Sequence, residues 1–105
     1  GKEMPADELK IVETKIFRGD IIEKLYQNYG RDIQISTLKA ALRVKKFFDD
    51  LEIQKAIYYL GGEEKRYVHV EVDKDNWMDS MIWLTPKGVN LAEGDIKDTG
   101  VVIDE

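Results

Sequence analysis

The chain has 105 residues, of which 43% are hydrophobic and 35% are charged, and its formal net charge is −5. This length and composition predict one domain with a substantial core, and no apolar run approaches the about 20 residues of a membrane-spanning helix. The absence of cysteine excludes disulfides, thiolate zinc sites and cysteine nucleophiles, and we expect a cytoplasmic protein.

The negative charge is concentrated at the C-terminal end. Residues 93–105 contain five acidic side chains and one lysine, a net charge of −4. The other 92 residues carry 15 basic and 16 acidic groups and are almost neutral. We therefore divide the chain into a flexible N-terminus (1–6), a single domain (7–94) and an acidic C-terminal tail (95–105).

The first predicted element is helical and runs from Asp7 to Tyr29. Its apolar residues form one stripe before Gly19 and another after it, with helical spacing. Asp7 is expected to cap the helix and Gly30 to end it. The segment is either one helix weakened at Gly19 or two helices joined by a bend.

Residues 33–35 predict a short edge strand. Ser36 is then expected to cap a second helix, TLKAALRVKK (37–46), and Asp49 to begin a third. Glu52 lies three residues after Asp49, which gives an Asp version of the capping box.

The third helix is predicted to end at Gly61-Gly62. Its inner face consists of Ile53, Ile57 and Leu60 at helical spacing. The opposite, outer face is predicted to carry Asp50, Gln54, Lys55 and Tyr58.

Two strands are predicted next. In YVHVEVD (67–73), alternation places three valines on one face and Tyr67, His69 and Glu71 on the other. Lys74-Asp75-Asn76 has turn chemistry, and SMIWLT (80–85) returns with Ile82 and Leu84 facing inward.

A short helix closes the pattern. Thr85 is expected to cap it, Pro86 suits its first position, and Gly94 stops it. The order of elements is helix, short strand, two helices, two strands and a short helix. This order predicts an α+β fold, a winged helix-turn-helix with an N-terminal helical extension and a C-terminal short helix followed by the acidic tail.

Several stretches carry a family resemblance. LTPKGVNLAEG (84–94) resembles the strand-to-helix ending of winged-helix regulators of the MarR and PadR type. Together with FDDLEIQKAIYYL (48–60), YVHVEVD and LTPKGVNLAEGDIKDTGV (84–101), it is similar to small winged-helix proteins encoded by Mu-like phages and prophages. The resemblance covers residues 18–101 and implies a DNA-binding transcriptional regulator of phage or prophage character, without enzymatic activity.

In a winged helix-turn-helix the third helix enters the major groove of double-stranded DNA, and basic side chains contact phosphates. The alternative for these basic residues is ordinary solvated surface, and acidic residues at the start of the third helix and in the hairpin oppose DNA binding. The candidate DNA-binding residues are Lys39, Arg43, Lys45, Lys46, Gln54, Lys55, Tyr58, Lys65, Arg66 and Lys74.

A second hypothesis uses the same scaffold as a protein-interaction module in phage assembly or in a larger complex. Its anchors are apolar residues of the first helix, which also predict a homodimer, and aromatic or methionine residues near the hairpin. The alternative for Met81 and Trp83 is that they cover the core. The candidate interface residues are Leu9, Val12, Ile16, Phe17, Trp77, Met81 and Trp83.

Catalysis and metal binding have little support in the sequence. His69 is the only histidine, and no local motif places a serine beside a base. DKDNWMD (73–79) has only part of a calcium-loop pattern, because Trp77 and Met78 occupy a ligand position and the glycine position. We expect no catalytic residue, no metal site and no cofactor.

Overall fold

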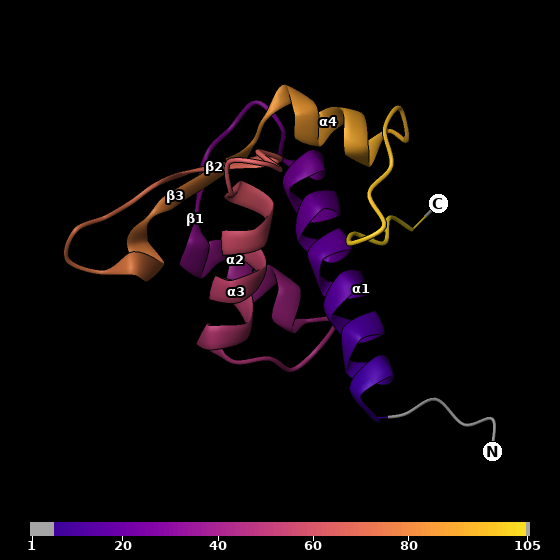
Figure 1. The fold of residues 1–105 in the computed structure, drawn as a ribbon. Coiled ribbons are helices and arrows are strands. Elements are labelled where there is room, and N and C mark those ends of the chain that lie inside the picture. The colour runs from indigo at the N-terminus through magenta and orange to yellow at the C-terminus, as the bar shows by residue number, and fades with distance from the viewer. Residues whose placement is uncertain (1–5, 105) are drawn as a thin grey trace, which may run out of the picture.

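The computed structural model describes residues 6–104. In this range the chain has an α+β fold with four α-helices and a three-stranded antiparallel sheet (Figure 1). The elements are α1 (Ala6–Gln27), β1 (Ile33–Gln34), α2 (Ile35–Arg43), α3 (Asp50–Gly61), β2 (Val68–Glu71), the 3-10 turn η1 (Trp77–Asp79), β3 (Met81–Leu84) and α4 (Pro86–Ala92). This confirms the predicted order of helices and strands; residues 1–5 of the predicted flexible N-terminus lie outside the described residues.

α1 is one continuous helix, so the alternative of two helices joined by a bend is wrong. It begins before Asp7, which lies in the first turn, where a negative charge interacts favourably with the helix dipole. Phe17, Ile21 and Leu25 are buried in the core. The helix continues through Gly19, where an added Cβ would lie 1.6 Å from the Val102 carbonyl oxygen.

β1 passes directly into α2. The helix begins at Ile35 with Gln34 at the N-cap, so the prediction that Ser36 caps this helix is wrong. The side chain of Ile35 is fully buried, and its N–H donates to the carbonyl of Ser80 (2.9 Å). This tertiary contact fixes the start of α2 one residue before the local capping pattern predicts it.

α3 begins with the predicted capping box. The Glu52 N–H donates to Asp49 Oδ1 (2.8 Å), and the Asp49 N–H donates to Glu52 Oε1 (3.4 Å). The inner residues Ile53, Ile57 and Leu60 are buried, whereas the four predicted outer residues are exposed. Both faces of this helix are therefore as predicted.

The sheet has the order β1-β3-β2, with Ile33 opposite Ile82 and Val68 opposite Leu84. Ile82 and Leu84 are buried, as predicted, on the face that the helices cover. The hairpin formed by β2, η1 and β3 projects away from α1 (Figure 1). Consequently Val72, which alternation places on the inner face, is 64% exposed.

Tyr67 departs from the prediction of a polar-face residue because it is buried. Its hydroxyl donates to Asp98 Oδ2 (2.6 Å), and the amino group of Lys87 lies 5.3 Å from its ring centroid. α4 and the residues after it thus cover this end of the sheet. The predicted cap of α4 is present, since Thr85 Oγ1 accepts from the Gly88 N–H (3.1 Å).

Residues 95–104, here called the C-terminal segment, return along α1 (Figure 1). The Val102 N–H donates to the Lys15 carbonyl (3.1 Å), Arg18 donates to the Gly100 carbonyl (3.1 Å), and Val101 is buried. The predicted acidic tail is therefore packed against the domain over these residues.

Candidate interaction surface on α3 and the hairpin

The outer face of α3 presents Gln54, Lys55 and Tyr58 to solvent. Tyr58 is 84% exposed, which is unusual for a large aromatic side chain. The orientation follows from the apolar spacing of the helix, because burying Ile53 and Ile57 turns these three side chains outward.

A groove of about 710 Å³ lies between α3 and the hairpin. One wall carries the Tyr58 ring, and the other carries Val70, Val72 and the half-buried Trp77. The residues that line this α3–hairpin groove are Gln54, Ile57, Tyr58, Gly61, Gly62, Glu63, Val68, His69, Val70, Val72 and Trp77. Exposed apolar surface in a groove with aromatic walls is typical of an interaction site.

The part of the chain that forms the groove is acidic. Residues 49–79, which form α3, the hairpin tip and the connection between them, contain nine carboxylates and four basic side chains, a net charge of −5. We call these residues the α3–hairpin surface. A surface with this excess of negative charge attracts positively charged partners and repels polyanions such as DNA.

Backbone hydrogen bonds hold the Asp73 carboxylate and the Asn76 side-chain amide of the hairpin tip in place. Asp73 Oδ1 accepts from the N–H groups of Asp75 (3.0 Å) and Asn76 (2.9 Å), and Asn76 Oδ1 accepts from the Met78 N–H (3.1 Å). The buried Ser80 hydroxyl accepts from the Asp73 N–H (2.8 Å). Residues 73–79 thus form a turn, and within residues 6–104 no three histidine, aspartate or glutamate side chains are grouped to hold a metal ion.

Three of the candidate DNA-binding lysines form ion pairs within the chain. Lys39 pairs with Asp50, Lys45 Nζ lies 3.1 Å from Asp20, and Lys65 Nζ lies 3.0 Å from Asp98. Hydrogen bonds to these carboxylates raise the pKa of Lys45 and of Lys65. Each pair cancels a positive charge that phosphate binding would require.

The other candidates are exposed, except for the half-buried Lys46. Arg43 donates to the Phe48 carbonyl (2.7 Å), Lys46 Nζ lies 5.1 Å from the Phe17 ring centroid, and Arg66 Nε donates to the Glu63 carbonyl (2.9 Å). Lys55 and Lys74 are exposed, as are Gln54 and Tyr58. Of the eight basic candidates three are thus paired with a carboxylate, and the other five take part in none of the ion pairs found within residues 6–104.

The candidate interface residues lie in three different places. Leu9, Val12 and Ile16 are exposed on α1, whereas Phe17 is buried, with its ring centroid 4.7 Å from that of Phe48. Because Phe17 is buried, it is not available to a partner. Trp77 lines the α3–hairpin groove, and Met81 and Trp83 lie half-buried on the face of the sheet away from the helices.

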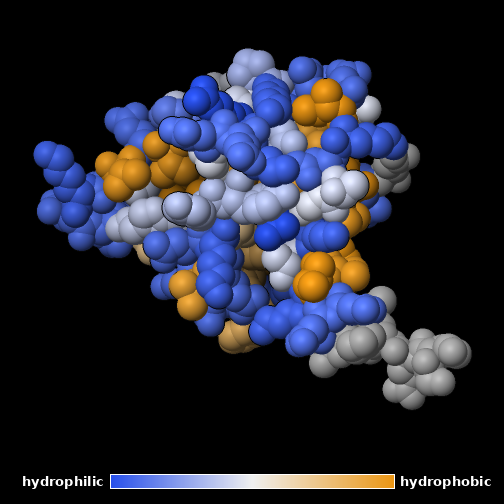
Figure 2. All heavy atoms as spheres, in the orientation of Figure 1, coloured by the Kyte–Doolittle hydropathy of each residue, from blue (hydrophilic) through white to orange (hydrophobic). Residues whose placement is uncertain are grey.

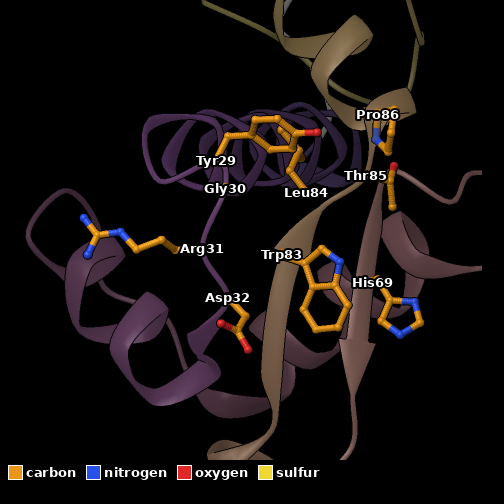
Figure 3. A pocket seen from close by; sticks show the side chains of 9 residues that line it. All are labelled: Tyr29, Gly30, Arg31, Asp32, His69, Trp83, Leu84, Thr85 and Pro86. Atoms are coloured by element: carbon orange, nitrogen blue, oxygen red, sulfur yellow. The ribbon is translucent and has the colours of Figure 1, made fainter.

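That outer face carries a second cleft, of about 610 Å³ (Figure 3). Trp83 lies at its centre and pairs across the strands with His69, with ring centroids 4.6 Å apart. Tyr29 and Asp32 approach from the loop between α1 and β1, and the Arg31 side chain extends away from the others (Figure 3). The sequence predicts Tyr29 as the end of the first helix and no candidate site that includes it, because only the tertiary fold brings this loop beside β3.

Comparison of the chain with protein-family models, with curated protein sequences and with solved structures gave no match. Among the helices of residues 6–104, none combines the length and the apolar character needed to cross a membrane.

Proposed function

We propose that this chain is a winged-helix protein-interaction module whose α3–hairpin groove binds a polypeptide segment with basic and apolar side chains. The winged-helix assignment is supported by the helix–strand–helix–helix–hairpin order and by the placement of β1 beside β3. The observation that carries the proposal is the combination of an apolar groove with a surface of net charge −5.

The chemistry of the groove fits such a partner. Tyr58, Val72 and Trp77 offer apolar contact area, and aromatic residues are common energetic anchors of protein interfaces. Glu63 lines this groove, and Asp73 and Asp75 follow Val72 in the hairpin; such carboxylates attract lysine or arginine side chains. The apolar contacts stabilise the complex, and the charges speed association and select the partner.

DNA binding by a transcriptional regulator is the second candidate. Gln54, Lys55 and Tyr58 favour it, because they are exposed on the helix that enters the major groove in a winged helix-turn-helix. The ion pairs of Lys39, Lys45 and Lys65 and the carboxylates of the hairpin oppose it. We therefore rank it second.

Peptide display on the immobilised chain tests the first proposal. We expect enrichment of sequences that have a net positive charge and several apolar residues. Fluorescence anisotropy of an enriched peptide should show affinity that falls as salt rises, because the surface charges are exposed and screened. Enrichment of neutral or acidic sequences, or of none, would contradict the proposal.

Substitutions locate the binding site. Tyr58→Ala, and separately Asp73→Lys combined with Asp75→Lys, should each weaken an enriched peptide by tenfold or more. Tyr29→Ala is the matched control, since Tyr29 is also exposed but lines the outer cleft. Loss of binding in the control with retention in Tyr58→Ala would move the site to the outer cleft.

Fluorescence anisotropy also decides between peptide binding and DNA binding. Mixed-sequence DNA duplexes at low salt should not bind the chain. Duplex binding that falls steeply with salt and is abolished by Lys46→Glu combined with Lys55→Glu would instead establish the DNA-binding alternative.

A further inference from the structure

β2 (Val68–Glu71) is an edge strand of the sheet. Within residues 6–104 it pairs only with β3, because the strand order is β1-β3-β2. In an antiparallel pair, alternate residues direct both of their backbone hydrogen-bonding groups toward the partner strand, and the residues between them direct theirs away from it. Every second residue of β2 therefore presents its N–H and its carbonyl at the open edge of the sheet.

The register of the hairpin identifies these outward residues. By extension of the pairing of β2 with β3, Tyr67 lies opposite Thr85, and the Tyr67 carbonyl accepts from the Thr85 N–H (3.0 Å). This pair is thus hydrogen-bonded, and the pairs alternate from there along β2. The backbone groups of Val68 and Val70 consequently point to the open edge, and Val72 is the next residue in the same alternation.

One part of the edge is covered and the other is open. The Val68 carbonyl oxygen lies 3.5 Å from the site of an added Cβ on Gly61, at the end of α3, and Val68 is buried. Nearer the hairpin tip, Val70 is half-buried and Val72 is 64% exposed. Outside the β2–β3 ladder, no hydrogen bond found within residues 6–104 involves the backbone of either residue.

The α3–hairpin groove runs along this edge. Its lining includes Val68, Val70 and Val72 from one face of the strand and His69 from the other. A groove that contacts both faces of a strand passes its edge, because successive side chains point to opposite faces. Figure 2 shows hydrophobic side chains exposed on the hairpin, beside hydrophilic ones at its tip. Open edges are commonly protected by lysine or proline, and the sequence VHVEV (68–72) contains neither.

We propose that the polypeptide segment in this groove binds as an extended strand that adds to β2 and forms hydrogen bonds with the backbone of Val70 and Val72. This inference rests on the function proposed above and specifies how the partner is held. An extended peptide supplies the alternating N–H and carbonyl groups that match such an edge. A helix does not, since its backbone groups are bonded internally.

Strand addition assigns the two kinds of partner side chain to two faces. On the inner face the added strand lies beside Val72, Tyr58 and Trp77, which line the groove and are apolar or aromatic. On the outer face it lies beside the exposed Glu71. Because successive side chains of a strand point to opposite faces, the partner should alternate apolar and basic residues.

A second copy of β2 matches this edge less well than a basic segment. Each copy carries Glu71 in the strand and Asp73 and Asp75 directly after it. Two edges brought together would place these carboxylates near one another, and like charges on neighbouring strands are destabilising. The charges of the hairpin therefore favour a partner of different sequence.

Two synthetic peptides of equal composition test the predicted alternation. One alternates lysine and valine over about nine residues, a usual length for a strand, and the other has the lysines in one block and the valines in another. Fluorescence anisotropy at low salt should show at least tenfold tighter binding of the alternating peptide. Equal binding of the two would overturn strand addition alone. Binding of neither would also overturn it, whereas the function proposed for the groove fails only if peptide display yields no basic, apolar sequence.

N-methylation of the alternating peptide separates backbone from side-chain contacts. Methyl groups on alternate amides block the hydrogen bonds along one edge of an extended peptide and leave the other edge intact. Methylation of one alternate set should abolish binding, and methylation of the other set should leave it unchanged. In an antiparallel arrangement the sensitive set is the valines, since directly opposite residues share a face. Equal effects of the two sets would overturn the proposal.

Val72→Pro makes the corresponding test on the chain. Proline removes the outward N–H, and the N–H groups that bond to β3 belong to other residues, so an edge strand tolerates it. The variant should bind the alternating peptide at least tenfold more weakly. Val72→Ala is the matched control, because it keeps the N–H, and it should weaken binding much less. Equal losses would overturn the proposal, and circular dichroism checks that both variants are folded.

Sedimentation equilibrium of the chain without peptide tests the other occupant of the edge. Any self-association should be the same in the natural chain and in Val72→Pro, because β2 is expected to pair with a different polypeptide. Self-association that Val72→Pro abolishes would assign the edge to a second copy of the chain and overturn the proposal.

Discussion

Gly19 lies where α1 meets the backbone of the C-terminal segment. A Cβ at this position would be 1.6 Å from the Val102 carbonyl oxygen and 2.7 Å from its carbonyl carbon. Backbone atoms cannot rotate away as the end of a flexible side chain can, so a larger residue displaces the segment. The glycine lowers helix propensity by up to about 1 kcal/mol relative to alanine, and close backbone packing offsets this cost.

Gly19→Ala should therefore destabilise the chain by about 1–3 kcal/mol despite its better helix propensity. The expected local effect is faster amide hydrogen exchange at residues 98–104. Gly61→Ala is the matched control, because its Cβ would meet only Val68, with the side chain at 3.4 Å and the carbonyl oxygen at 3.5 Å, which are ordinary contacts. Unchanged exchange in the C-terminal segment of Gly19→Ala would contradict this account.

At the scale of elements, the caps of α2 and α3 differ in kind. α3 has a reciprocal capping box, whereas α2 starts from Gln34 without a side-chain cap. Asp49→Ala should cost about 1 kcal/mol of unfolding free energy because two backbone N–H groups at the helix start depend on the box. Ser36→Ala should change stability by less than about 0.5 kcal/mol. Urea denaturation of both variants measures the difference, and equal losses would show that Ser36 contributes a cap after all.

This contrast also explains which elements the sequence predicts. The starts of α3 and α4 depend on hydrogen bonds between residues three apart, so Asp49 and Thr85 reveal them locally. The start of α2 depends on Ile35 and Ser80, which are 45 positions apart, and no local pattern reveals that contact. The burial of Tyr67 depends in the same way on Asp98.

The candidate surfaces were less predictable than the elements. Helical spacing correctly placed Gln54, Lys55 and Tyr58 outside, because the outer face is defined by the inner one. The partners of the surface lysines and the burial of Phe17 against Phe48 depend on how α1, α2 and α3 pack. Composition reports the total charge of the chain but not which charges neutralise one another.

At the scale of the whole molecule, Asp98 connects the C-terminal segment to Lys65 and Tyr67, which lie between α3 and β2. Burial raises the pKa of its carboxyl. Hydrogen bonds from Tyr67, the Gly100 N–H and Lys65 lower this pKa by a larger amount, so that it is about 2. Burial, together with the hydrogen bond to Asp98, raises the pKa of Tyr67 to about 12. The folded state thus favours the ionised carboxyl and the neutral phenol.

The free energy of unfolding should depend on the protonation of Asp98 at low pH and on that of Tyr67 at high pH. Since the Asp98 pKa is lower in the folded state than its ordinary 3.8, its contribution of about 2 kcal/mol is present above pH 4 and is lost as pH falls toward 2. The Tyr67 contribution is present below pH 10 and is lost as pH rises toward 12.

Asp98→Asn should therefore be less stable than the natural chain at pH 7, and the difference should shrink between pH 4 and pH 2. Asp95→Asn, at an exposed position of the same segment, should track the natural chain throughout. Thermal unfolding followed by circular dichroism at a series of pH values provides the measurement. A difference that is independent of pH would show that the carboxylate charge is not what stabilises the cluster.

The return of residues 95–104 onto α1 has a consequence for synthesis. A ribosome makes α1 first and the C-terminal segment after all the helices and strands, yet Lys15 and Val102 are hydrogen-bonded neighbours. Until the segment emerges, the strip of α1 around Gly19 is uncovered and Val101 is missing from the core. Contacts between such distant residues form slowly because a long loop must close. The nascent chain thus has an interval in which this strip of α1 is accessible to chaperones.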